Sequence, residues 1–224
     1  MIERGCPVVD KFRDPLLSRK DTARHLAIPQ STLNRWLGEE AAGSPLVHGV
    51  QPEHVGWPSV PFVAVVEAYV LRSLRDLGLS MNKIREAAAE VRTTFDTPFG
   101  LATHKIATDG IDIFLDFAPD DLARVGDRQR PIREVLDGYL RYIEWDTEDD
   151  FASRLKLRQY PDIAPVVIDP RFGWGAPVVA ENSVPVEAIV SMWLAGDSIT
   201  EVAYEYELEP AQVESICRVW RAAA

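Results

Sequence analysis

Residues 17–37 carry two short helical patterns separated by a tight break, and this feature constrains the fold more than any other. Ser18, followed three residues later by Asp21, fits a capping box and predicts that a helix begins here. Residues 27–29 end that helix, because Pro29 lacks an amide donor and is tolerated only in the first turn of a second helix. Two short helices joined by a tight turn form a helix-turn-helix.

The second of these helices has one apolar face and one polar face. Leu33, Trp36 and Leu37 recur at i, i+3 and i+4 and so point inward together. The polar side chains that point outward are those of Gln30, Ser31, Thr32, Asn34 and Arg35. In a major groove, amides pair with adenine, arginine pairs with guanine or holds a phosphate, and hydroxyls near a helix N-terminus bind phosphate. These five residues are candidate DNA contacts; the alternative is an ordinary surface helix with a solvated polar face.

The segment after the second helix predicts a loop followed by two further helices. Residues 43–50 indicate a turn and a short strand, and Gln51–Pro58 is a loop that contains glycine and proline. An apolar face predicts a helix over about residues 61–77; Gly78 ends it, and Ser80 opens the next helix.

Two stretches of this region resemble the DNA-binding module of the MerR family, in that family's order. They are LSRKDTARHLAIPQSTLNRW at Leu17–Trp36 and LRDLGLSMNKIR at Leu74–Arg85. The resemblance covers about residues 15–92 and implies a winged helix-turn-helix, with Gln51–Pro58 as the wing and with His48 and His54 touching the DNA backbone. No long heptad helix follows Arg92, so we place the contacts of the expected homodimer outside this domain.

The charge of the chain is unevenly distributed, which matters for DNA binding. The net charge is −11 in all, but +1 over residues 1–95, −5 over 96–160 and −7 over 161–224. A near-neutral N-terminal region can present a basic face to phosphates, whereas the acidic remainder suits a basic protein partner or is simply a solvated surface.

Other function classes are disfavoured by composition. Cys6 and Cys217 are too few and too far apart for a disulfide framework or a cysteine metal site. The chain has no secretory signal and no apolar run of about 20 residues, so we expect a cytoplasmic protein without a membrane span.

The middle of the chain has a mixed pattern. Residues 101–106 and 111–117 predict two strands about the turn at residues 108–110, and therefore a hairpin. Apolar residues at helical spacing predict an amphipathic helix over 132–143. The acidic run at 144–150 is interpreted as a solvated loop rather than a metal site, because no second carboxylate-rich segment completes one.

The last part of the chain predicts a small helical domain after two short strands, at residues 166–168 and 178–179. Its helices are expected at residues 186–195, 199–206 and 210–222. Residues 172–176 contain Gly-x-Gly but lack the third glycine and the lysine of a phosphate-binding loop. Acidic residues along these helices disfavour a second DNA contact, so the domain is expected to bind protein or to dimerise.

The C-terminal motifs resemble a small bacterial domain of unknown function that is associated with antitoxins. They run in order as IDP (168–170), GxPVV (175–179), VPVxxI (184–189), AGDSIxEVA (195–203) and LEPAQV (208–213). Where the family pattern has Gly-Thr-Arg, this chain has residues 181–183 as Glu-Asn-Ser, so any role of that arginine is absent here.

A winged helix-turn-helix followed by this domain resembles the large VapB-type antitoxins, which pair with PIN-domain ribonuclease toxins. The resemblance implies that the chain neutralises such a toxin and represses its own operon by binding operator DNA. A cation would be needed to cover the toxin's metal-binding carboxylates, and the candidates for this contact are Arg171, Arg218 and Arg221.

The sequence therefore predicts a mainly α (α+β) fold in three parts: a winged helix-turn-helix over residues 1–95, a central β-hairpin and helix over 96–160, and a small three-helix domain over 161–224. We expect an antitoxin with no cofactor and no metal. The alternative is a MerR-like transcription regulator with a ligand- or protein-sensing C-terminal half. An enzyme comes third, because the four histidines are not at ligand spacing and no nucleophile–base pair can be placed.

Overall fold

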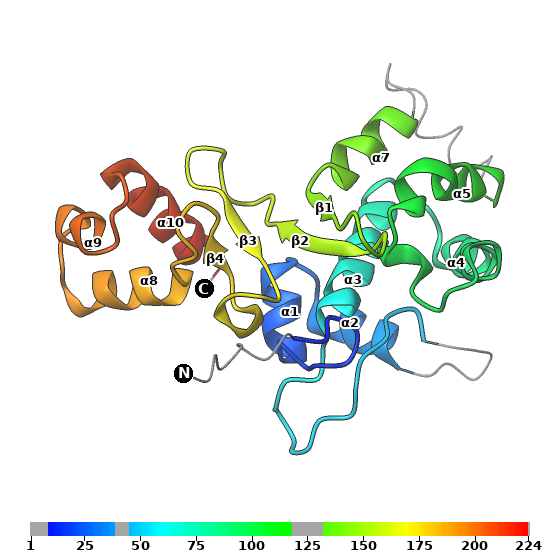
Figure 1. Cartoon of the computed structure of the whole chain (residues 1–224), viewed down its shortest axis with the longest axis horizontal. Helices are drawn as coiled ribbons and strands as arrows, with labels where there is room; N and C mark the ends of the chain where they lie inside the picture. The colour runs from blue at the N-terminus through cyan, green and yellow to red at the C-terminus, as the bar shows by residue number, and fades with distance from the viewer. Residues whose placement is uncertain (1–8, 39–44, 118–131, 224) are drawn as a thin grey trace, which may run out of the picture. The chain divides into compact units, whose positions relative to one another are not determined.

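The computed structural model describes residues 9–38, 45–117 and 132–223 (Figure 1). The chain divides into two compact units. The N-terminal unit is Phe12–Ser153, and the C-terminal unit is Arg154–Ala224 together with the described residues 9–11. Most of the segment that the sequence analysis set apart as residues 96–160 thus belongs to the N-terminal unit.

The helix-turn-helix is present at the start of the N-terminal unit. Helix α1 (Arg19–His25) begins where the Ser18 hydroxyl accepts a hydrogen bond from the Asp21 backbone N–H at 3.1 Å, as the capping box predicts. Helix α2 (Gln30–Leu37) follows directly after Pro29. The two helices pack against each other, and Leu33 and Trp36 of α2 are buried.

Two longer helices form the centre of this unit. Helix α3 (Phe62–Asp76) is buried over its first ten residues, and helix α4 (Met81–Phe95) is capped by the Ser80 hydroxyl, as expected. Residues 43 and 44 of the expected turn lie outside the described residues, and residues 45–50 form no strand. Leu17 forms an isolated antiparallel bridge to Val60.

The predicted hairpin at residues 101–117 is wrong, because this segment is helical. It contains the short helical turns η1 (Gly100–Ala102) and η2 (Ile106–Gly110), then helix α5 (Ile111–Phe117), which packs against α4. The buried side chains recur at helical spacing, at 106, 111 and 114, rather than alternating. Gly110 is not a turn residue: a Cβ there would lie 2.6 Å from the Ile106 side chain, so glycine permits close packing within the helical segment.

A hairpin does occur, but it lies later in the chain. Helix α7 (Ile132–Leu140) ends earlier than expected, and strands β1 (Ile143–Trp145) and β2 (Ala152–Lys156) flank the acidic run. Two backbone N–H groups in the turn donate to aspartate side chains of the run, Glu148 to Asp146 and Phe151 to Asp149, each at 3.0 Å. The acidic residues therefore organise a solvent-exposed turn, in keeping with the loop interpretation.

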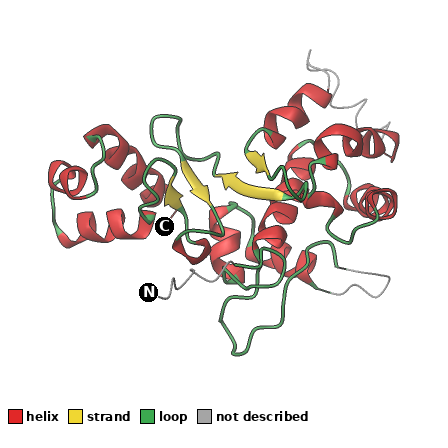
Figure 2. Cartoon of the chain, in the orientation of Figure 1, coloured by secondary structure: helices red, strands yellow, loops and turns green. Residues whose placement is uncertain are grey.

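The sheet has the strand order β1-β2-β3-β4 (Figure 2). Strand β2 pairs antiparallel with β3 (Val166–Ile168) in the register Leu155 to Ile168, and β3 pairs antiparallel with β4 (Val178–Val179) in the register Val166 to Val179. Both predicted C-terminal strands are confirmed.

The three C-terminal helices are also confirmed, and they pack against one another. They are α8 (Val186–Ala195), α9 (Ile199–Glu205) and α10 (Pro210–Ala223). Gly196, at φ 113°, ends α8 in the left-handed conformation, and Ser198 and Glu201 form a capping box at the start of α9. About half of the described residues are helical and a few form a small antiparallel sheet, which confirms the α+β class. Within the described residues, no helix has the length and hydropathy needed to cross a bilayer.

Candidate functional site: an exposed recognition helix and a C-terminal loop

Helix α2 presents its polar side to solvent because its apolar side is fixed in the core. Leu33 is fully buried, and Trp36 and Leu37 are buried beside it. Of the five predicted DNA contacts on α2, four are therefore exposed and one, Thr32, is half-buried. The exposed ones are Gln30, Ser31, Asn34 and Arg35. They form a polar surface on one short helix of the size that enters a major groove.

The N-terminus of α2 has no side-chain cap, because its cap residue is Pro29. The amide groups of a first helical turn have no partners within the helix and attract anions. Ser31 and Thr32 lie in this first turn, where their hydroxyls suit a phosphate together with the N–H groups that have no partner in the turn; the Thr32 N–H itself donates to the Pro29 carbonyl at 2.9 Å.

His25 lies at the end of α1 and is 8% exposed. Burial, and then the nearby positive charge of Arg24, lower the pKa of His25 from the ordinary 6.5 to about 4. The imidazole is therefore neutral in the folded helix-turn-helix at neutral pH.

The buried His25 predicts acid sensitivity of the N-terminal unit. Between pH 6.5 and about 4 the unfolded chain binds a proton that the folded unit does not, so the free energy of unfolding falls with falling pH, by about 3 kcal/mol at pH 4. Urea unfolding at several pH values should give a flatter dependence for His25→Gln. His54→Gln, at an exposed histidine, is the matched control and should keep the wild-type slope. Equal slopes in both variants would contradict a neutral buried imidazole.

The loop predicted as a wing projects from the N-terminal unit (Figure 1, cyan). Its ends are joined by a hydrogen bond from the Val50 N–H to the Ser59 carbonyl at 2.9 Å. Between them most side chains are exposed, and Val55 is completely so. His54 is exposed there and its ring lies 4.6 Å from that of Trp57.

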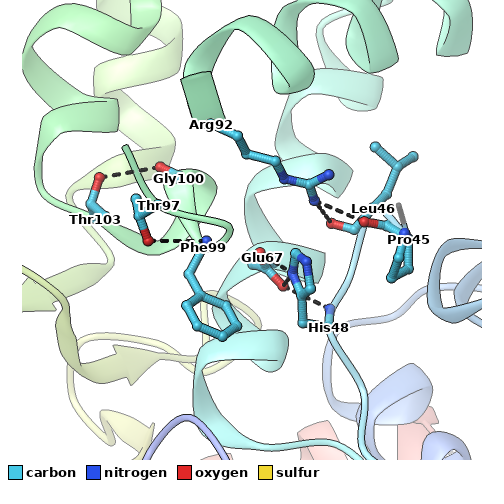
Figure 3. Close-up of polar contacts among 9 residues, drawn as sticks. All are labelled: Pro45, Leu46, His48, Glu67, Arg92, Thr97, Phe99, Gly100 and Thr103. Carbon is cyan, nitrogen blue, oxygen red and sulfur yellow. Dashed lines mark hydrogen bonds and ion pairs between the residues drawn. The ribbon is translucent and has the colours of Figure 1, made fainter. Parts of the chain in front are cut away.

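His48, the other histidine expected to touch DNA, has a partner inside the protein (Figure 3). The fully buried Glu67 carboxylate accepts the His48 backbone N–H at 2.9 Å and contacts the ring Nδ1 at 2.9 Å. The His48 ring also packs edge-on against Phe99 at 5.0 Å. The structure thus gives His48 the role of fixing the start of the loop against α3.

Arg92 of α4 binds the same segment at Pro45 and Leu46 (Figure 3). Its guanidinium donates to the carbonyls of Pro45 and Leu46 at 2.8 and 3.1 Å. Sequence reasoning missed both Glu67 and Arg92. The available signal for Glu67 was a carboxylate inside an apolar run, which in a folded protein requires a partner.

In the C-terminal unit, Asp169 directly follows β3 and forms hydrogen bonds with two arginines. Its carboxylate is fully buried and accepts from Arg154 Nε at 3.0 Å, and from Arg171 Nε at 2.9 Å and Nη2 at 2.7 Å. Burial alone would raise the pKa of Asp169, but the hydrogen bonds from Arg171 and Arg154 outweigh it and hold the pKa below its usual range. Arg171, predicted to bind the toxin, is thereby fixed in place while its side chain stays 62% exposed.

The other two arginines predicted to contact the toxin lie together on α10. Arg218 and Arg221 line an open pocket of about 360 Å³ with residues of α8, α9 and α10. Arg218 pairs with Glu214 one turn earlier, at 2.6 Å, and both side chains are exposed. The structure therefore places Arg171 on the loop after β3 and the other two on a helix surface.

Comparison with known proteins agrees with this arrangement. A family described as "Putative DNA-binding HTH domain" matches residues 15–88, and one described as "Protein of unknown function (DUF433)" matches residues 166–218. The chain is 32% identical to a Mycobacterium tuberculosis protein named "Putative antitoxin VapB45", over 91% of this chain and 92% of the relative. The crystal structure of Rv2018 from M. tuberculosis matches with a TM-score of 0.78 and 31% identity, over 92% of this chain and 98% of that one. The chain therefore belongs to the family of the VapB45 antitoxin, with a helix-turn-helix DNA-binding domain near its N-terminus and a DUF433 domain near its C-terminus.

Proposed function

We propose that this chain is the antitoxin of a two-protein system: it neutralises a PIN-domain ribonuclease in the cytoplasm and represses its own operon by binding operator DNA. The observation that carries the proposal is the likeness, over nine-tenths of both chains, to a protein named as a VapB antitoxin. The exposed polar face of α2 and the acidic C-terminal half support the two activities separately.

The DNA-binding activity is assigned to the N-terminal unit. Its exposed helix α2 offers an arginine and two amides for base edges, and its projecting loop at residues 51–58 supports the proposal of a wing. The chain binds DNA as a homodimer in this proposal, because helix-turn-helix proteins generally read two half-sites with two copies.

Arg35→Ala is expected to weaken operator binding by about 5- to 150-fold and to relax sequence preference, because an arginine–guanine pair contributes about 1–3 kcal/mol. Gel-shift titrations at fixed salt against the promoter DNA of the operon measure this. Lys83→Ala, which removes a cation from an exposed position on α4, is the control and should bind within about twofold of wild type. Equal losses for the two variants would mean that the contact is only general charge attraction, and no loss for Arg35→Ala would refute the recognition helix.

The toxin-binding activity is assigned to the C-terminal half. Residues 96–224 carry a net charge of −12, and a ribonuclease surrounds its active site with a basic surface that binds RNA. Charge complementarity of this kind speeds association and fades with salt. Arg171, Arg218 and Arg221 are the cations proposed to meet carboxylates of the toxin.

A further inference from the structure

The loop that follows β3 has a strained backbone. Gly173, Trp174 and Gly175 all have positive φ, at 60°, 51° and 80°. Such values suit glycine but are unfavourable for tryptophan, whose Cβ crowds the backbone there. Hydrogen bonds hold the loop in this form, including Phe172 N–H to the Asp169 carbonyl at 3.1 Å and Ala176 N–H to the Gly173 carbonyl at 2.9 Å.

The strain is not compensated by burial of the indole. The Trp174 side chain is 77% exposed, and the neighbouring Phe172 is 42% exposed. A large aromatic group kept in water on a strained backbone contributes nothing to the stability of the isolated chain, and strain of this kind gathers at functional positions.

The same loop displays a fixed cation. The Arg171 guanidinium donates two side-chain hydrogen bonds to the Asp169 carboxylate, which orient it, and it also lies 5.7 Å from the centre of the Phe172 ring. Arg171 is the only lysine or arginine between residues 159 and 217, so it stands in an otherwise acidic stretch. Asp169 is thus a positioning residue for Arg171.

An exposed tryptophan beside an exposed arginine has the composition of a binding hot spot, and a rigid loop loses little entropy when it binds. We infer that the Arg171–Trp174 loop is the anchor by which this chain binds the ribonuclease, with the Trp174 indole entering an apolar pocket of the toxin and Arg171 pairing with a carboxylate at the rim of that pocket. The inference rests on the proposed function. The C-terminal half is strongly negative, so charge repulsion disfavours both a phosphate ligand and a second copy of this half as the partner of the loop.

The test uses the purified full-length chain and the ribonuclease encoded beside it, with affinity measured by calorimetry and inhibition by cleavage of a fluorescent RNA. Trp174→Ala should weaken binding about 30-fold or more, the size of a hot-spot loss. Arg171→Ala should weaken it about tenfold or more, and Arg171→Lys should recover only part of this because lysine lacks the planar fork. Trp57→Ala, at the exposed tryptophan of the other unit, is the matched control and should bind the ribonuclease within about twofold of wild type.

Trp174→Gly separates a binding role from a structural one. Glycine relieves the positive φ, and little buried surface is lost, so the melting temperature should stay or rise while binding to the ribonuclease falls as far as for Trp174→Ala. A lowered melting temperature for Trp174→Gly would overturn the inference and make the indole a stabilising group.

The remaining outcomes are distinguishable. If the wild-type chain neither binds nor inhibits the ribonuclease, the proposed function itself fails. If wild type inhibits and Trp174→Ala inhibits equally, only the anchor is wrong. If Trp174→Ala instead dissociates a homodimer in sedimentation, or weakens operator binding, the loop contacts a second copy or DNA, and the inference is overturned.

Discussion

Replacing Asp169 with asparagine should lower the free energy of unfolding of the C-terminal unit by about 3 kcal/mol. Two arginines donate to this buried carboxylate, and an asparagine amide would turn its own donors towards one of them. The estimate lies at the low end for a broken buried ion pair because the side chains of Arg154 and Arg171 both reach solvent. Urea unfolding followed by circular dichroism at neutral pH measures the loss.

The matched control for this substitution is Asp162→Asn. Asp162 also pairs with a cation of β2, Lys156 at 2.6 Å, but its side chain is 95% exposed. An exposed pair of this kind contributes about 0–1 kcal/mol, so the control should unfold almost like wild type. Similar losses for both variants would mean that burial does not set the strength of the Asp169 contacts.

In the N-terminal unit, Glu67→Ala is expected to cost about 3–5 kcal/mol. The change leaves a cavity in the buried face of α3 and removes the partner of the His48 backbone N–H and of its ring Nδ1. Because His48 begins the loop that carries residues 51–58, operator affinity should fall as well, although Glu67 is buried and cannot touch DNA. Thermal and urea unfolding of the full chain, with gel shifts below the transition, give both quantities.

Glu86→Ala serves as the control for Glu67→Ala. Glu86 lies on α4 with its side chain 56% exposed, 4.0 Å from Lys83, so its loss should change stability by less than about 0.5 kcal/mol. If Glu67→Ala lost stability but kept full operator affinity, the loop would not depend on His48 and Glu67 for its position.

The elements that the sequence predicted correctly are those with local signals. Ser18 and Ser80 cap the helices that were expected to start after them, and α8 and α9, bounded by Gly196 and Ser198, end and begin at the predicted residues 195 and 199. Capping is decided within a few residues, so the sequence alone contains the information. The exposed face of α2 was predictable for the same reason, since its three core residues are at i, i+3 and i+4.

Contacts between distant residues could not be predicted in this way. His48 and Glu67 are 19 residues apart, and Arg154 and Asp169 are 15 apart, so their pairing depends on how the elements pack. The error at residues 101–117 has a related cause. Apolar and β-branched residues about a Thr-Asp-Gly stretch favour a hairpin locally, but packing of α5 against α4 stabilises a helix there instead.

In the loop after β3, the residue that holds the backbone and the residues that face solvent are different ones. Asp169 carries the local structure and has no exposed surface, whereas Phe172 and Trp174 lie largely outside the core. If the loop is the anchor inferred above, substitutions at 172 and 174 should alter binding at little cost in stability, whereas a substitution at 169 should lower stability before it alters binding. The loop therefore separates the residue that holds its shape from the residues that would meet a partner.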